Sequence, residues 1–348
     1  MLAAEPKAAG AALADPLNPA GAPAWKAIVA PVEPFLRAVA VRLAEQVAEF
    51  EPEVAAHARY ALLSQGKQLR PALVALSGEA TGGINDDLVT AATIIEMVHL
   101  ATLVHDDVVD EAQIRRRRPT LAAQAGNTTS VLVGDCLFAH ALKLAASFPT
   151  TEVCRAVSSA TKTVCTGEII QSQRQHQLRT SRGEYFRVLR MKTAELFAVS
   201  CELGAHLSGG SAGDGRALRD YGLALGTAYQ VYDDCLDVFG SEVRAGKSLR
   251  TDLVGGKPTL PVIVAWERAS ADERRFLERM VAAWEPDFMR PLAELFERTE
   301  ALPEARSVIR SLCTSAQAAL RSLSPSEGRE RLAAAAEYIA HQTDDLGS

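Results

Sequence analysis

The sequence has few of the residues that mark β-sheet proteins and nucleic-acid-binding proteins. Aromatic residues make up 5% of the 348 positions, and runs of β-branched residues are short. Alanine and leucine are abundant instead, and no alternation of apolar and polar residues persists, so the composition favours helices. The formal net charge of −6 at pH 7 gives no electrostatic support to a nucleic-acid partner.

Paired cysteines and long apolar runs are also missing. The 6 cysteines are scattered over apolar segments without a C-x-x-C pair, which is typical of reduced core residues in a cytoplasmic protein. No uninterrupted stretch of about 18 apolar residues is found, so we expect no membrane span. Residues 1–24 are rich in alanine, proline and glycine but lack the features of a signal peptide, and we predict a disordered tail.

From Trp25 to about Ala340, apolar residues recur with the spacing of helices. Several segments, among them DDLVTAATIIEMVHLATLVHDDVVDEA, are apolar on nearly every side, and such helices belong at the centre of a large bundle. No linker divides these segments. We therefore predict one all-α domain, a single large helical bundle, over residues 25–345.

Two acidic motifs of the form D-D-x-x-D lie in helix-like segments: LVHDDVVDEA contains Asp106, and YQVYDDCLDVF contains Asp233. On a helix, the first and last Asp of such a motif share one face, where like charges repel unless a cation lies between them. One acidic cluster is compatible with a solvated surface, but two copies indicate facing walls of one site. Mg²⁺ suits this arrangement, because it is typically held by one or two carboxylates plus substrate phosphates.

Isolated cations lie in other apolar or glycine-rich segments. Each one alone is compatible with an ordinary solvated side chain. Together with the acidic motifs, they suggest a diphosphate held by metal on one side and by Arg and Lys on the other. These cations are Lys67, Arg70, Arg115, Arg116, Lys192, Lys247 and Lys257.

The motifs and their neighbours resemble, in this order, those of the trans-type isoprenyl diphosphate synthases, the polyprenyl synthetase family. The matching segments lie between about residues 25 and 270 and include GKQLRP, HLATLVHDDVVDEAQIRRRRPT, GEIIQ, MKTAELF, YGLALGTAYQVYDDCLD and GGKPTLP. The long-chain octaprenyl and solanesyl type is the most similar. The resemblance implies a bundle of the isoprenoid synthase type with a central apolar cavity, and commonly a homodimer.

The resemblance also assigns roles to individual residues. It implies about three Mg²⁺ ions, with Mn²⁺ as a substitute. The metal-site residues are Asp106, Asp110, Asp233 and Asp237 as expected ligands, and Asp107 and Asp234 as residues that complete the site, partly through water. The residues expected around the allylic diphosphate are Arg115, Lys192, Thr193, Gln230, Lys247 and Lys257. Those expected around isopentenyl diphosphate are Lys67, Arg70, His99 and Arg116, although His99 by itself would be read as a core histidine.

The implied activity is a Mg²⁺-dependent prenyl transfer. Farnesyl or geranylgeranyl diphosphate ionises, the double bond of isopentenyl diphosphate attacks the cation, and a proton is lost, all within a dry apolar cavity. In this family, the residues four and five positions before the first Asp form a floor beneath the growing chain. Here these residues are Thr102 and Ala101, both small. We therefore expect an all-trans product longer than C20, unless Met97, Phe138 or another deeper residue closes the pocket sooner.

Three alternatives stay open. A geranylgeranyl diphosphate synthase would stop at C20. A class I terpene cyclase usually keeps one acidic motif and needs no isopentenyl pocket, and a non-catalytic regulatory subunit typically loses acidic motifs, whereas this chain has both. Departures from the family pattern at Gln65, Arg117 and Arg250 remove no expected metal ligand. Release of a long apolar product predicts transient contact with a membrane surface, without a dedicated amphipathic anchor.

Overall fold

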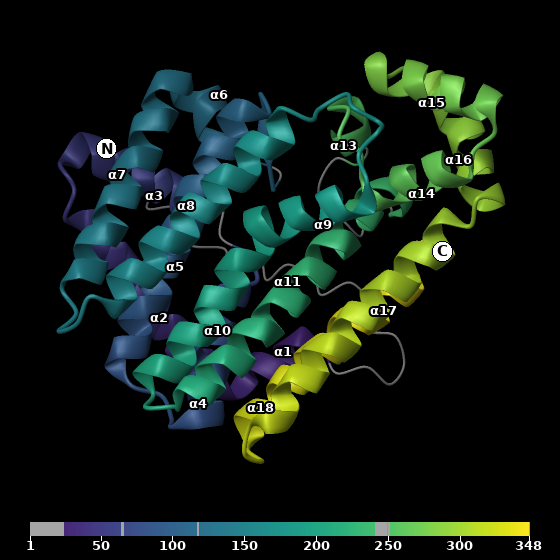
Figure 1. Ribbon diagram of the computed structural model, residues 1–348. Helices are drawn as coiled ribbons and strands as arrows, with labels where there is room; N and C mark the ends of the chain where they lie inside the picture. The colour runs from purple at the N-terminus through teal and green to yellow at the C-terminus, as the bar shows by residue number, and fades with distance from the viewer. Residues whose placement is uncertain (1–23, 64–65, 117, 241–248, 250, 348) are drawn as a thin grey trace, which may run out of the picture.

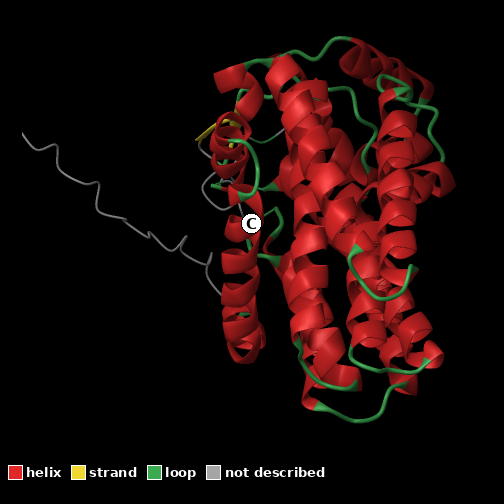
Figure 2. Cartoon of the chain, turned by 90° about the vertical axis from the view of Figure 1, so that its left-hand side faces the viewer, coloured by secondary structure: helices red, strands yellow, loops and turns green. Residues whose placement is uncertain are grey.

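The computed structural model describes residues 24–347, apart from residues 64–65, 117, 241–248 and 250. Within this part of the chain nearly every element is a helix, and β1 (Ile114–Arg115) and β2 (Arg118–Pro119) form one short antiparallel ladder. Figure 2 shows long helices running alongside one another. The predicted all-α class is therefore confirmed. The tail predicted for residues 1–24 lies outside the described residues except for Ala24.

The helices fall into three consecutive groups along the chain, labelled as in Figure 1. The first group contains α1 (Trp25–Val29), η1 (Ala30–Val32), α2 (Glu33–Ala48), α3 (Pro52–Leu62), α4 (Leu69–Thr81), α5 (Asp86–Val109), α6 (Leu121–Ala125), α7 (Asn127–Ala146) and α8 (Glu152–Ser172). The second group contains α9 (Arg182–Leu189), η2 (Arg190–Ala194), α10 (Glu195–Leu207), α11 (Ala212–Phe239), α13 (Thr251–Val254) and α14 (Leu260–Arg268). The third contains α15 (Ala271–Ala282), η3 (Pro286–Phe288), α16 (Met289–Arg298), α17 (Ala301–Ala319), η4 (Leu320–Ser322), α18 (Glu327–Gln342) and η5 (Thr343–Asp345).

Polar side chains define the starts of the helices that matter for the site. The Asn85 side chain accepts the N–H of Leu88 at the start of α5. Ser181 and Glu184 form a reciprocal capping box at α9, and a second such box begins α11. These side chains satisfy backbone N–H groups that have no partner inside the helix.

The interior of the bundle is formed by α5, α10 and α11. Helix α5 packs against α2, α4, α7 and α10, while α10 packs against α4, α8 and α11 (Figure 1). Helix α17 covers another side of α11. The side chains of Ile94, Ile95 and Met97 on α5 are at most 1% exposed. Helix α5 is apolar on nearly every side because it is surrounded by other helices.

The expectation that no segment is apolar enough to span a membrane needs correction. Among the described residues, α5 and α7 are long and apolar enough by length and composition. In α5, 72% of the most apolar window is buried, as expected for the core helix of a bundle. In α7 the buried share is 39%, and exposed apolar residues such as Leu132 and Leu142 account for part of the difference. Length and composition alone are weak evidence of a membrane span.

Helices α10 and α11 approach closely where α11 has glycine. A Cβ atom added to Gly222 would lie 2.7 Å from the Cα atom of Ala198 and 2.7 Å from the carbonyl oxygen of Phe197. A Cβ atom added to Gly215, near the start of the same helix, meets nothing within 4 Å. The two glycines therefore separate the effect of helix contact from the effect of helix propensity.

We predict that Gly222→Ala lowers the free energy of unfolding by about 1–3 kcal/mol, because the backbones must move apart. Gly215→Ala is the matched control and should raise it by about 0.5–1 kcal/mol, because alanine is the better helix former. Urea or thermal unfolding of both variants measures the difference. Equal stabilisation by both substitutions would contradict the close contact at Gly222.

Candidate active site

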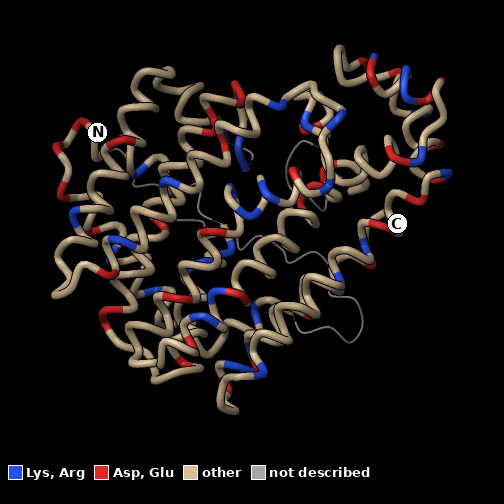
Figure 3. Tube along the Cα trace, in the orientation of Figure 1, with Lys and Arg blue, Asp and Glu red and all other residues tan. Residues whose placement is uncertain are grey.

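The two acidic motifs lie at the C-terminal ends of their helices. Asp106 and Asp107 are in the last turn of α5, and Asp110 follows it directly. The second motif lies in the final turns of α11, and neither helix has a basic residue in its last turn. The C-terminus is the negative end of the helix dipole, so these carboxylates need cations from other segments. Figure 3 shows acidic and basic positions close together in the upper central part of the bundle, around α9 and α13.

The segment containing α13 contacts both motifs. Lys257 Nζ donates to the two carboxylate oxygens of Asp110 at 3.1 and 3.3 Å, and it lies 3.8 Å from Asp252 Oδ1. At the start of α13, the N–H groups of Thr251 and Asp252 donate to Asp237 at 3.3 and 3.1 Å. The two motifs therefore border one region of the protein, as facing walls of a single site would.

Asp106 lies in an environment that disfavours its charge. Burial raises the pKa of Asp106 to about 6, with Lys192 opposing this shift and Glu168 reinforcing it. A positive charge placed close to Asp106 would stabilise its carboxylate form.

Two other acids of the motifs, Asp107 and Asp234, accept hydrogen bonds from neighbouring side chains. Asp107 is 5% exposed and accepts a hydrogen bond from Arg115 Nε at 2.7 Å. Burial raises the pKa of Asp107, and Arg115 opposes that shift. Asp234, also 5% exposed, accepts the Tyr185 hydroxyl at 2.6 Å and Gln230 Nε2 at 2.8 Å. Burial raises the pKa of Asp234 to about 8. Asp107 and Asp234 thus anchor Arg115, Tyr185 and Gln230.

The acids differ in how available they are to a metal ion. Within the described residues, no three His, Cys, Asp or Glu side chains are already gathered in metal-binding geometry. Asp110 is exposed, and Asp106 and Asp233 are half-buried. Asp237 is 1% exposed, and both its oxygens accept hydrogen bonds from the start of α13. An oxygen-only donor set of Asp106, Asp110 and Asp233 fits Mg²⁺ that takes its remaining ligands from phosphates and water.

A π-helical turn, η2, places Lys192 and Thr193 at the site. Lys192 contacts the Glu168 carboxylate and donates to Gln171 Oε1 at 2.7 Å. Thr193 Oγ1 donates to Gln230 Oε1 at 2.8 Å, and that glutamine in turn contacts Asp234. Turns of this kind are frequent at functional sites, because they re-aim side chains within a helix. Here the turn directs Lys192 toward α8 and Thr193 toward α11.

Gly167 on α8 makes room for this turn. A Cβ atom at Gly167 would lie 2.8 Å from the backbone nitrogen of Lys192. The glycine of the GEIIQ segment therefore has a packing role that helps to position Lys192.

A second group of cations surrounds Arg70. The Arg70 guanidinium lies 5.0 Å above the Phe197 ring, and its Nε atom is buried without a hydrogen-bond partner. Burial lowers the pKa of Arg70, and the nearby Glu96 carboxyl opposes that shift. A buried donor without a partner is uncommon in native proteins and calls for a ligand. The unused N–H of Arg70 is therefore suited to an anion such as a phosphate.

The other members of this group lie nearby. Arg116 occupies the turn between β1 and β2 with a φ of +49°, and a Cβ atom at Gly66 would overlap its guanidinium. Lys67 Nζ lies 3.1 Å from the Tyr338 hydroxyl of α18. Burial lowers the pKa of His99 well below 6.5, and the charges of Arg70 and Arg116 add to this effect. His99 is therefore a neutral side chain in a strongly basic environment.

The two expected floor residues differ in environment. Ala101 is 0% exposed and already enclosed by the core. Thr102 is half-buried, and its hydroxyl donates to the His99 carbonyl at 2.7 Å. A small pocket lies beside α5, on the side of Leu100 and Val104. It is lined by Tyr60, Ala61, Leu100, Leu103, Val104, Asp107, Arg115, Thr120 and Leu121. The central apolar cavity stays a prediction.

Some residues expected at the site lie outside the described part of the structure, and some of the observed contacts were not expected from the sequence. Lys247 lies outside the described residues, as do Gln65, Arg117 and Arg250. The contact of Tyr185 with Asp234 was missed, because the two residues are 49 positions apart and no local pattern links them. Glu168 and Gln171 belong to the matching segment GEIIQ, but no role was assigned to them.

The fold and the site define an all-α protein in which two acidic helix ends meet a group of lysines and arginines. A family model described as Polyprenyl synthetase matches residues 51–295. The chain therefore belongs to the polyprenyl synthetase family and is a prenyltransferase.

Its relatives make products of different lengths. The chain is 34% identical to the short chain isoprenyl diphosphate synthase of Methanothermobacter thermautotrophicus, over 86% of this chain and 93% of that protein. It is 33% identical to the octaprenyl diphosphate synthase of Escherichia coli, over 82% of this chain and 88% of that protein. The structure of polyprenyl synthase from Caulobacter crescentus, complexed with calcium and isoprenyl diphosphate, superposes with a TM-score of 0.87 at 32% identity. That comparison covers 92% of this chain and 99% of the other.

We predict that Tyr185→Phe weakens both stability and prenyl transfer. Loss of the hydroxyl leaves a buried Asp234 oxygen with one partner fewer, at a cost of about 1–3 kcal/mol. It also releases the Asp234–Gln230–Thr193 chain of contacts. Urea unfolding and steady-state kinetics on the folded variant measure the two effects.

Tyr221→Phe is the control, because Tyr221 is also buried and its hydroxyl donates to the Leu332 carbonyl at 2.7 Å. It should lose stability without a change in turnover. If Tyr185→Phe behaved in the same way, the Tyr185 contact would be structural only.

Proposed function

We propose that the protein condenses isopentenyl diphosphate with farnesyl or geranylgeranyl diphosphate to give an all-trans polyprenyl diphosphate longer than C20. The observation that carries this proposal is the meeting of the two acidic motifs with two separate groups of cations. Lys257, Lys192 and Arg115 lie at the acidic motifs. The second group lies around the unpartnered Nε atom of Arg70. Two diphosphate substrates need two such anion sites.

The allylic diphosphate would occupy the region between the motifs. Asp106, Asp110 and Asp233 would hold Mg²⁺, which neutralises charge on the departing diphosphate when bound. Lys192 and Lys257 stabilise the same developing charge from the protein side. Both lysines are held by carboxylates, Lys192 by Glu168 and Lys257 by Asp110, so their ammonium groups are already oriented.

Isopentenyl diphosphate would bind in the second group of cations. Arg70 offers an unused N–H, and Lys67 and Arg116 add positive charge. The planar guanidinium groups match phosphate oxygens in pairs. The neutral His99 ring contributes a hydrogen bond without altering the charge of the site.

The chemistry follows from this placement. The carbon–oxygen bond of the allylic substrate breaks, and its electron pair leaves with the diphosphate. The double bond of isopentenyl diphosphate supplies the electrons of the new carbon–carbon bond. The resulting cation loses a proton, which the departed diphosphate accepts, and a double bond re-forms. Apolar walls from α5 and α10 exclude water, which would otherwise quench the cation.

Product length is the finer part of the proposal. The small side chains of Ala101 and Thr102 favour a long product, and the octaprenyl relative supports the same direction. The short-chain relative supports the C20 alternative, a geranylgeranyl diphosphate synthase. A terpene cyclase would not need the Arg70 group of cations, and a regulatory subunit would not need both acidic motifs.

We predict a ladder of products when the protein is incubated with labelled isopentenyl diphosphate, farnesyl diphosphate and Mg²⁺. The dephosphorylated products are sized by chromatography. A ladder that ends beyond C20 supports the long-chain proposal, and a stop at C20 assigns the alternative. Removal of divalent cations with EDTA should abolish elongation, and added Mg²⁺ should restore it.

Asp106→Asn tests the metal role in the same assay. It should lower turnover by about 10²-fold or more, because one charged oxygen ligand is lost. Absence of elongation by the wild type with any primer would contradict the proposed function.

The proposal includes a homodimer that uses α7. Its outward stripe exposes Val131, Leu132 and Leu142, which are 39%, 58% and 36% exposed. Exposed apolar side chains gathered on one helix, here beside the charged Asp135, are compatible with an isologous interface. The six cysteines are free, which supports a cytoplasmic location, and release of a long product would involve transient contact with a membrane surface.

We predict that the double substitution Leu132→Asp and Leu142→Asp converts a dimer into monomers, because charges replace the apolar face. Light scattering coupled to size-exclusion chromatography measures the mass. Val41→Asp is the control, because Val41 on α2 is also 58% exposed but lies outside the α7 stripe. A wild-type monomer, or a dimer that survives the double substitution, would refute this interface.

A further inference from the structure

The connection between α8 and α9 passes beside α13, as Figure 1 shows, and contacts the turn that carries Lys257. In this connection His176 has a φ of +62°, in the left-handed region that few residues other than glycine adopt and that asparagine, aspartate and histidine tolerate best. Its backbone N–H donates to the Gly256 carbonyl at 2.8 Å. Its Nδ1 atom lies 2.6 Å from the Val281 carbonyl, so the ring carries its proton on Nδ1. His176 therefore joins three segments of the fold.

The turn after α13 is built to receive this ring. The N–H groups of Gly255, Gly256 and Lys257 close the turn onto carbonyls of α13 at 2.9, 3.1 and 2.8 Å. Gly256 has a φ of +64°, and a Cβ atom there would overlap the His176 ring. The ring thus rests on the glycine immediately before Lys257, whose ammonium group reaches Asp110.

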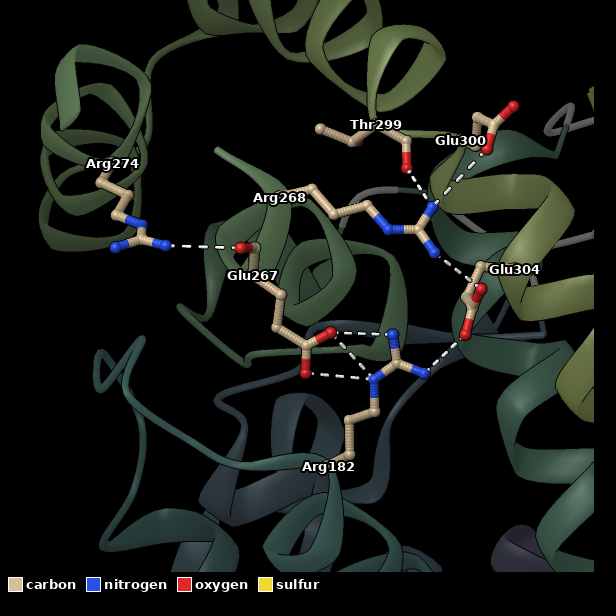
Figure 4. A network of polar contacts seen from close by, with 7 residues as sticks. All are labelled: Arg182, Glu267, Arg268, Arg274, Thr299, Glu300 and Glu304. Atoms are coloured by element: carbon tan, nitrogen blue, oxygen red, sulfur yellow. Dashed lines mark hydrogen bonds and ion pairs between the residues drawn. The ribbon is translucent and has the colours of Figure 1, made fainter. Parts of the chain in front are cut away.

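The connection is anchored at the end that leads into α9. Arg182, at the start of α9, pairs with Glu267 of α14 at 2.7 Å and with Glu304 of α17 at 2.6 Å. Arg268 also pairs with Glu304, at 2.8 Å, so the network shown in Figure 4 ties α9, α14 and α17 together. Closer to His176, Arg174 pairs with Glu184 at 2.9 Å. His176 therefore contacts the Gly255–Lys257 turn from a segment that these ion pairs hold in place.

We infer that His176 is a positioning residue for prenyl transfer: it holds the Gly255–Lys257 turn so that the Lys257 ammonium group meets Asp110 and the allylic diphosphate. This inference rests on the proposed function. A backbone in the left-handed region costs about 1–3 kcal/mol and persists only where its surroundings determine it. Here the surroundings are the Gly256 and Val281 carbonyls and the face of Gly256. The turn that they position carries Lys257, which lies between Asp110 and Asp252.

Three substitutions separate the contributions of backbone and ring. His176→Gly keeps access to positive φ but loses the ring, and His176→Ala loses both. His176→Asn keeps both a tolerance for positive φ and an N–H near the position of Nδ1. We expect His176→Ala and His176→Gly to lower kcat/KM for the allylic diphosphate about tenfold, with KM for isopentenyl diphosphate unchanged. His176→Asn should recover most of the wild-type value.

The decisive comparison uses a Lys257→Ala background. If His176 acts through Lys257, His176→Ala should cause less than about a twofold further loss there. An equal loss in both backgrounds would show a structural role only and overturn the inference. His206→Ala is the control, because His206 pairs with Glu152 at the bundle surface, and it should leave the kinetics unchanged.

Hydrogen exchange makes the test independent of the proposed function. The Lys257 amide, bonded to the Asp252 carbonyl, should exchange about tenfold faster in His176→Ala than in the wild type. Unchanged protection overturns the inference whether or not the wild type elongates a prenyl chain. Faster exchange in His176→Ala, found together with a wild type that shows no elongation, would support the positioning role of His176 and refute the prenyl-transfer proposal alone.

Discussion

The electrostatic balance at two negative helix ends is the constraint on which the rest of the site depends. Helices α5 and α11 each end in three aspartates at the negative end of their dipoles, without a basic residue in the last turn. The fold offsets this charge with segments from elsewhere in the chain. Arg115 arrives on a strand, Lys192 on a π-helical turn and Lys257 on the turn after α13.

This balance divides each motif into structural and available acids. Asp107 and Asp234 are nearly buried and held by Arg115, Tyr185 and Gln230. Asp106 is half-buried and its charge is only partly compensated, since burial raises its pKa to about 6 despite Lys192. A divalent cation bound with a diphosphate would supply the missing compensation. Metal and substrate binding would thereby be coupled, because neither alone completes the set of charges.

The parts of this structure that could be predicted from sequence are those that depend on local spacing. The helices follow from apolar periodicity, and the position of α5 in the core follows from its apolar character on nearly every side. The segment GEIIQ was one of the matching segments, but its proximity to Lys192 depends on the contact between α8 and η2, where Gly167 packs closely. The same limit applies to Tyr185 and Asp234, which only the tertiary fold brings together. The capping of α13 by Asp237 is likewise a contact between elements.

Tertiary contacts also limit what the residues before the first acidic motif indicate about product length. A small residue at position 101 leaves no space by itself, since the Ala101 side chain is already enclosed by neighbouring helices. One turn further along α5, the His105 ring packs against Phe138 of α7 with ring centroids 5.6 Å apart. Gly134 lets α7 approach this closely, because a Cβ atom there would overlap His105. The space beneath the site therefore depends on how α7 packs against α5. Because the outer face of α7 is the apolar stripe proposed for the dimer, product length and subunit association are expected to depend on the same helix.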